Sequence, residues 1–172
     1  IEEYEVICIG YAVFRDCIGI TSIVIPDSVI SIDRSVFSGC TSLAEITVSP
    51  DNKNYSSVDG VLFNKDGSEL IVYPKGNGRS AYTVPDGVTS ISGSAFSGCT
   101  SLTEIIIPDS VTSIGWSAFS GCTSLLKVKL SNNLTKIEYG AFCDCTSLAE
   151  IVIPDSVIAI GEYAFFGCTS LA

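Results

Sequence analysis

Cysteine is the residue whose type and spacing most invite a chemical interpretation. The chain of 172 residues contains eight cysteines, six of which are separated by steps of 23 or 59 residues. These six are Cys17, Cys40, Cys99, Cys122, Cys145 and Cys168. Clustered thiols can bind a metal or carry redox chemistry. The regular step favours a different prediction, a column of small buried thiols between stacked repeats, because the period alone explains their positions. Parallel Cβ vectors would strain disulfides along such a column, so most of its thiols are predicted to be reduced.

The other residues that could do chemistry are few. Cys143-Asp144-Cys145 is a C-x-C pair rather than the C-x-x-C of zinc sites, and only Cys8 and Cys143 fall outside the column. Histidine is absent, which removes the commonest general base and metal ligand. No glycine-rich phosphate loop is present. The sequence therefore predicts no catalytic residue, no cofactor and no metal site.

A repeated unit must position these cysteines. A phenylalanine precedes each of the six by three positions, as Phe96 precedes Cys99. In one unit Leu102, Ile105 and Ile107 form the pattern L-x-x-I-x-I, which predicts a short strand with one buried face. The segment SAFSGCTSL predicts a tight turn or a single helical turn. One unit cannot bury its apolar face alone, so the units are expected to stack and to pair their strands in a parallel sheet.

The repeats predict one domain over residues 1–172, interrupted once. Its repeats lie near residues 9–31, 32–48, 91–113, 114–136, 137–159 and 160–172, with an irregular insert over 49–90. Two apolar runs in the insert flank Asn64-Lys65-Asp66-Gly67, which predicts a β-hairpin. We expect two irregular rungs and a protruding ribbon, with Phe63 and Tyr73 as a second candidate binding surface.

This pattern resembles the BspA-like family of leucine-rich repeats, whose 23-residue unit reads L-x-x-I-x-I-P-x-x-V-x-x-I-x-x-x-A-F-x-x-C. The match covers residues 6–48 and 85–172 closely. The resemblance implies an α/β to mostly β repeat solenoid: a right-handed horseshoe with a parallel sheet on its concave face, short helical or 3-10 turns elsewhere, and a β-hairpin insert. It also implies a secreted or surface-displayed protein linked to adhesion. One unit, LSNNLTK at 130–136, lacks the usual proline and acidic residue, so its turn is expected to differ.

Charge narrows the class of partner. With 9 basic and 19 acidic residues, the chain has a net charge of −10. This disfavours nucleic acid and anionic membrane surfaces, both of which require basic patches. The apolar runs are too short to span a bilayer.

The outward positions of the strands would form columns across the stack. The candidate partner-binding face consists of Glu45, Thr47, Glu104, Ile106, Asp109, Lys127, Lys129, Glu150, Val152 and Asp155. Its alternative interpretation is an ordinary solvated strand face.

Three functions remain open. The leading hypothesis is a non-catalytic module that binds a host or matrix macromolecule. The second is a structural spacer in a larger surface protein. The third is a carboxylate-based hydrolase that uses Glu104 and Asp109. The chain also begins and stops within a unit, so either a longer native chain or end-to-end self-association through uncapped repeats is expected.

Overall fold

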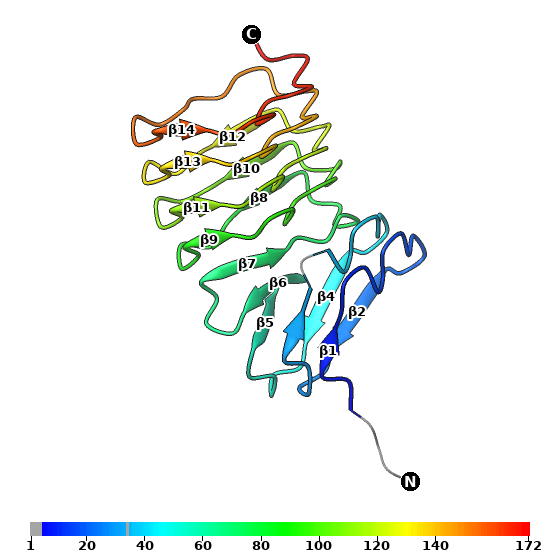
Figure 1. The fold of residues 1–172 in the computed structure, drawn as a ribbon. Coiled ribbons are helices and arrows are strands. Elements are labelled where there is room, and N and C mark those ends of the chain that lie inside the picture. The colour runs from blue at the N-terminus through cyan, green and yellow to red at the C-terminus, as the bar shows by residue number, and fades with distance from the viewer. Residues whose placement is uncertain (1–4, 34) are drawn as a thin grey trace.

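The chain folds into successive coils that stack on one another (Figure 1). The computed structural model describes residues 5–33 and 35–172, and these residues form strands and turns with no helix. One set of strands comprises β2 (Ser22–Ile25), β4 (Glu45–Val48), β8 (Ala81–Thr83), β10 (Glu104–Ile106) and β12 (Lys127–Lys129). A second set comprises β1 (Cys8–Ile9), β3 (Ser31–Ile32), β7 (Glu69–Val72), β9 (Ser90–Ile91), β11 (Ser113–Ile114), β13 (Lys136–Ile137) and β14 (Ala159–Ile160). The remaining strands, β5 (Tyr55–Val58) and β6 (Val61–Asn64), belong to the insert.

Neighbouring coils pair in parallel, with a register that repeats the sequence period. Glu104 lies opposite Lys127 in the β10–β12 pair, and Ser90 lies opposite Ser113 in the β9–β11 pair. Along β10 the side chain of Ile105 is fully buried, whereas its two neighbours are partly exposed. Because successive side chains of a strand face opposite ways, each coil buries one face and leaves the other to solvent. The predicted solenoid of stacked parallel strands is confirmed.

In each coil the segment that leads from the strand of the second set to the strand of the first set, as from β9 to β10, is a series of hydrogen-bonded turns. The predicted helical turns are therefore not confirmed. Alternate amides donate to the next coil: Ser94 to Trp116 O at 2.9 Å, Phe96 to Ala118 O at 2.8 Å and Gly98 to Ser120 O at 2.8 Å. Intervening amides donate within the coil, three residues back. Ser94 and Gly98 also adopt φ values of 59° and 72°, which no right-handed helix contains. Half of the amides thus hold the neighbouring coil instead of closing helical turns.

The unit over residues 130–136, which lacks the usual proline, closes its turn in the same way as the other units. Ser131 stands where another unit has Pro108, and its side chain is buried. The Leu134 amide donates to Ser131 O at 3.2 Å, as the Val111 amide donates to Pro108 O at 3.0 Å. The expectation of a different turn at this unit is therefore wrong, because the backbone bond that closes the turn does not require proline.

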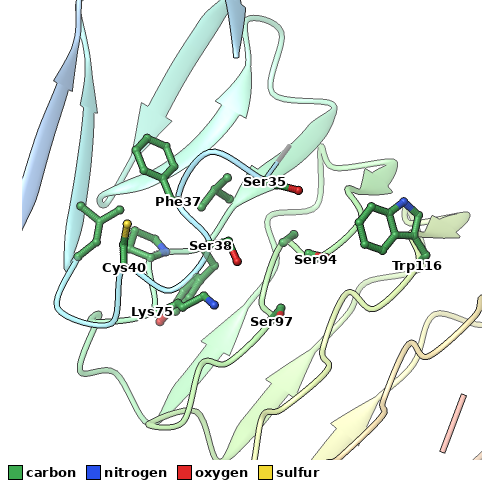
Figure 2. A pocket seen from close by; sticks show the side chains of 13 residues that line it. Ser35, Phe37, Ser38, Cys40, Lys75, Ser94, Ser97 and Trp116 are labelled. Carbon is green, nitrogen blue, oxygen red and sulfur yellow. The ribbon is translucent and has the colours of Figure 1, made fainter. Parts of the chain in front are cut away.

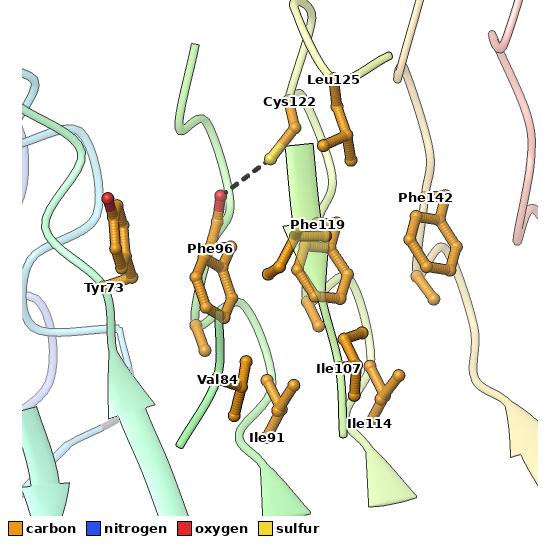
Figure 3. Close-up of a cluster of buried hydrophobic side chains, with 14 of the residues drawn as sticks. Tyr73, Val84, Ile91, Phe96, Ile107, Ile114, Phe119, Cys122, Leu125 and Phe142 are labelled. Carbon is orange, nitrogen blue, oxygen red and sulfur yellow. Dashed lines mark hydrogen bonds between the residues drawn. The ribbon is translucent and has the colours of Figure 1, made fainter. Parts of the chain in front are cut away.

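A spine of aromatic rings runs through the core (Figure 3). Phe119 is fully buried, and its ring centroid lies 5.0 Å from that of Phe96 and 5.1 Å from that of Phe142. Tyr73, which lies 23 residues before Phe96, continues the spine at 5.0 Å. The rings therefore act as the shared core that covers the apolar side of each coil.

The insert is built into the stack rather than projecting from it. The turn at Asn64–Gly67 joins β6 and β7, as predicted, and β5 adds a third antiparallel strand. Phe63 and Tyr73 are only 2% and 1% exposed, so the expected protruding ribbon and its second binding surface are wrong. The physical reason is that β7 pairs in parallel with β9, which draws the apolar residues of β6 and β7 into the core. In Figure 1 the direction of the strands changes across this insert.

Candidate binding surfaces

Part of the predicted binding face is formed by the outward side chains of β10 and β12, which we call the strand face. Glu104 lies opposite Lys127, and Ile106 lies opposite Lys129. Both lysines are exposed, and neither forms an ion pair with the residues that the structure describes. These two ammonium groups, two residues apart on β12, form a small basic patch flanked by the carboxylates of Glu104 and Asp109 in a chain of net charge −10. Such a patch can attract an acidic surface on a partner.

The carboxylate of Asp109 already accepts hydrogen bonds from a neighbouring coil. One of its carboxylate oxygens accepts the backbone N–H of Asn132 at 2.9 Å, and the other accepts the Asn132 side-chain amide at 3.3 Å. The backbone N–H and amide of Asn132, assisted by the charge of Lys129, lower the pKa of Asp109. Its main role is to join two coils. Both carboxylate oxygens of Asp109 are engaged by Asn132 rather than free to act on a substrate, which argues against the hydrolase hypothesis built on Glu104 and Asp109.

Glu45 and Thr47 lie apart from the strand face. They belong to β4, which pairs with β2 in a separate sheet from β8, β10 and β12. The hairpin separates the two sheets, since the Ile46 amide donates to Gly60 O at 2.9 Å. Glu45 and Thr47 line an open, mostly polar hollow of about 560 Å³ together with Arg79.

Three further candidates lie beyond the last strand of the face. Glu150, Val152 and Asp155 are exposed, with Val152 reaching 80%. They follow β12, which is the edge of its three-stranded sheet. The structure therefore brings together four of the ten predicted residues, Glu104, Ile106, Lys127 and Lys129, in one continuous register.

Sequence reasoning missed Arg79, Lys75 and Trp116, all of which line hollows in the surface. Arg79 and Lys75 fall in the insert, where the period that guided the prediction is broken. Trp116 is the single tryptophan of the chain and lies 23 residues after Gly93. Such departures from the repeat were the signal that could have identified these residues.

The cysteine column has a structural role that the sequence indicated only in part. All eight cysteines are free thiols. The Cys122 thiol donates to Phe96 O at 3.1 Å (Figure 3), and that of Cys145 donates to Phe119 O at 3.2 Å. Burial raises the pKa of the Cys99 thiol to about 12 and also raises the pKa of Cys122 and Cys145. Each thiol thus remains protonated and serves as a weak donor that joins successive coils.

We expect these buried thiols to resist alkylation in the folded protein. At pH 8 iodoacetamide should modify the exposed Cys8 at least about 100-fold faster than Cys99, Cys122 or Cys145, because only the thiolate reacts and burial blocks access. Peptide mapping by mass spectrometry measures the four rates, and protein unfolded in guanidinium provides the control in which all react alike. Equal labelling of Cys8 and Cys122 in the folded state would contradict the assignment.

No convergent metal site or membrane-spanning helix occurs within the described residues. No group of three or more histidine, cysteine, aspartate and glutamate side chains within residues 5–33 and 35–172 could hold a metal ion. No helix in that part of the chain is long and apolar enough to cross a bilayer.

The stacked coils, the aromatic spine and the parallel strands define the chain as a leucine-rich-repeat solenoid. The chain belongs to the family described as BspA type leucine rich repeat region, which matches in six copies over residues 7–65 and 75–172. The predicted family is thus confirmed. Leucine-rich repeats are typically non-catalytic and generally mediate protein interactions.

Several solved structures resemble this chain. A leucine rich cell surface protein from Faecalibacterium prausnitzii A2-165 is 37% identical, with a TM-score of 0.82 over 88% of this chain and 40% of its own. The pneumococcal vaccine antigen PcpA is 31% identical, with a TM-score of 0.84 over 87% of this chain and 37% of its own. The chain thus spans about two fifths of the length of each. A comparison with curated proteins gave no match.

Proposed function

We infer that the chain is a non-catalytic protein-binding module of a secreted or surface-displayed protein, and that it contributes to adhesion to host or matrix macromolecules. The observation that carries this proposal is the strand face, on which Lys127 and Lys129 stand exposed and unpaired beside Glu104 and Ile106. Extended faces of this kind let a solenoid apply many side chains to one partner. The likeness to a cell surface protein and to a vaccine antigen supports display outside the cell.

The partner is expected to present an acidic surface to these lysines. A basic pair on an exposed face affects mainly the rate of association, and this contribution weakens as salt screens the charges. Ile106, which is partly exposed between charged neighbours, supplies apolar area that can be covered on binding. The surface therefore combines an electrostatic steering group with a small hydrophobic contact.

A double charge reversal tests the proposal. We expect Lys127→Glu with Lys129→Glu to weaken binding to an immobilised matrix protein by at least about tenfold, the equivalent of ~1.4 kcal/mol. Biolayer interferometry against a panel of collagens, laminin and fibrinogen measures the dissociation constants, and rising salt should weaken binding of the unmodified chain alone.

The matched control reverses Lys53 and Lys65, two exposed lysines of the insert. An equal loss in this control would mean that net charge, rather than the strand face, determines binding. Saturable binding that is indifferent to the reversal of Lys127 and Lys129 would place the contact elsewhere on the chain. Absence of saturable binding to any partner would favour the alternative, a structural spacer.

A further inference from the structure

A cavity opens on the turn side of the stack, at the level where the hairpin interrupts it (Figure 2). Its volume is about 190 Å³. One wall is the turn between β3 and β4, in what we call the second coil, which carries Phe37 and Ser38. The opposite wall is the turn between β9 and β10, which carries Ser94 and Ser97. Lys75 lies at its base and Trp116 at its outer rim, as Figure 2 shows. The cavity lies apart from the strand face, since it shares none of the lysines of β12.

The hairpin explains why the cavity exists. Strands β5 and β6 extend the sheet of β7, β9 and β11, and the Tyr55 hydroxyl accepts the Ile32 amide at 2.9 Å, so the two added strands separate the second coil from the next. Each added strand requires about 4.8 Å. The turn side receives no added strand: the two coils meet where the Gly76 amide donates to Leu43 O at 2.8 Å, and the space beside Phe37 and Ser38 stays open. The core divides at this level into two clusters, with Phe37 in one and Tyr73 in the other.

This separation also removes the acceptors that the turn of a following coil supplies elsewhere in the stack. In the coil before it, Phe14 and Asp16 donate their amides to Val36 O and Ser38 O. The equivalent amides of Phe37 and Gly39 have no acceptor among residues 5–33 and 35–172. Because amides at these two positions point toward the following coil, that of Phe37 faces the cavity. An amide that faces a cavity can donate to water or to a ligand oxygen.

Lys75 gives the cavity a positive charge. It is the one charged side chain among the described lining residues, in a chain of net charge −10. It forms no ion pair within the described part of the chain. Its ammonium group lies against the turn that carries Ser97, since a Cβ at Gly98 would lie 3.2 Å from Lys75 Nζ. A half-buried cation without a counter-ion favours a carboxylate ligand.

The remaining lining suits a hydroxyl-rich ring. Ser38, Ser94 and Ser97 offer hydroxyls that both donate and accept. The Trp116 indole covers Gly93 so closely that a Cβ there would lie 2.8 Å from the ring, yet the side chain remains 46% exposed. The indole is therefore held against Gly93, while nearly half of the side chain remains open to solvent. Pockets for larger ligands commonly measure about 300–1,000 Å³, so this cavity suits a single small ring.

From these observations we propose that the cavity binds one acidic monosaccharide residue, a pyranose that carries a carboxylate. The carboxylate pairs with Lys75, the sugar hydroxyls bond with the serines and the Phe37 amide, and the ring packs on Trp116. An acidic peptide would satisfy Lys75 as well, but it would leave the array of hydroxyls and the exposed part of the indole largely unused. The proposal concerns a different surface from the strand face and does not depend on it.

The single tryptophan makes the test direct. In ¹H–¹⁵N NMR the chain gives one indole N–H signal, which belongs to Trp116. Titration with glucuronate should shift this signal saturably. Glucose and acetate, which each lack one of the two recognised features, should bind at least about tenfold more weakly. Lys75→Gln should weaken glucuronate binding at least about tenfold, whereas Lys75→Arg should retain it.

The control is Lys65→Gln, which removes an exposed lysine outside the cavity and should leave glucuronate binding unchanged. Unchanged amide spectra away from the cavity establish that each variant is folded. The proposal is overturned if glucuronate gives no saturable shift, if Lys75→Gln binds it as well as the unmodified chain, or if acetate binds equally well. Tighter binding of a tetraglutamate peptide than of glucuronate would identify a peptide site instead and would also overturn it.

Discussion

Phe119→Ala should lower the free energy of unfolding by about 3–5 kcal/mol. Phe119 is fully buried and stacks on a ring in each neighbouring coil, at 5.0 Å and 5.1 Å between centroids. Truncation removes both stacked pairs and leaves a cavity between coils that cannot close, because the backbone bonds between coils hold their spacing. Denaturation in urea, followed by circular dichroism, measures the loss.

The matched control is Phe166→Ala, the same truncation on the same side of the stack. Phe166 is 61% exposed and makes an edge contact with Tyr163 rather than a stack within the core. Its replacement should cost less than about 1 kcal/mol. If the two variants differed by less than this amount, the rings would not be the principal core of the solenoid.

Gly115→Ala should lower the free energy of unfolding by about 2–3 kcal/mol, although it adds a single methyl group. A Cβ at Gly115 would lie 2.4 Å from Gly93 N and 2.7 Å from Gly93 Cα. Both obstacles are backbone atoms of the preceding coil, so no side chain can rotate to make room. The two coils must separate, which weakens the bond from the Gly115 amide to Ile91 O, now 2.8 Å long.

Gly87→Ala provides the comparison, because a Cβ at Gly87 would meet no atom within 4 Å. Here the substitution should leave the stability unchanged or raise it by up to about 1 kcal/mol, since alanine restricts the unfolded chain. Thermal denaturation of both variants, monitored by the same spectroscopic signal, measures the difference. A Gly115→Ala protein as stable as Gly87→Ala would mean that the coils are packed less closely than the structure indicates.

The two surfaces proposed for binding differ in how they arise. The strand face follows from the repeat, because the 23-residue period places Glu104 beside Lys127 and Ile106 beside Lys129. The cavity arises where the repeat fails, since two strands are added on one side of the stack and none on the turn side. A solenoid can therefore acquire an additional concave site through one local insertion.

The amino-acid sequence by itself determined the stacking, the parallel register, the aromatic spine and the thiol column. Each of these depends on contacts between one unit and its nearest neighbours, and every unit carries the residues for both sides of that contact. Spacing such as that between Phe96 and Phe119 therefore translates directly into a contact in space. The turn at Asn64–Gly67 was predictable for a similar reason, because its hydrogen bond spans only three residues.

Only the tertiary structure decided the features that depend on partners outside the local unit. The turns are not helical because their alternate amides bind carbonyls 22 residues away, as Phe96 binds Ala118. Asp109 joins coils rather than facing a partner because Asn132 captures its carboxylate. Leu62, Phe63 and Leu70 of the hairpin are buried, and Lys75 and Trp116 border one cavity, because strand pairing with β9 sets where the insert lies. These outcomes depend on competition between local and long-range hydrogen bonds, which the period of the sequence does not encode.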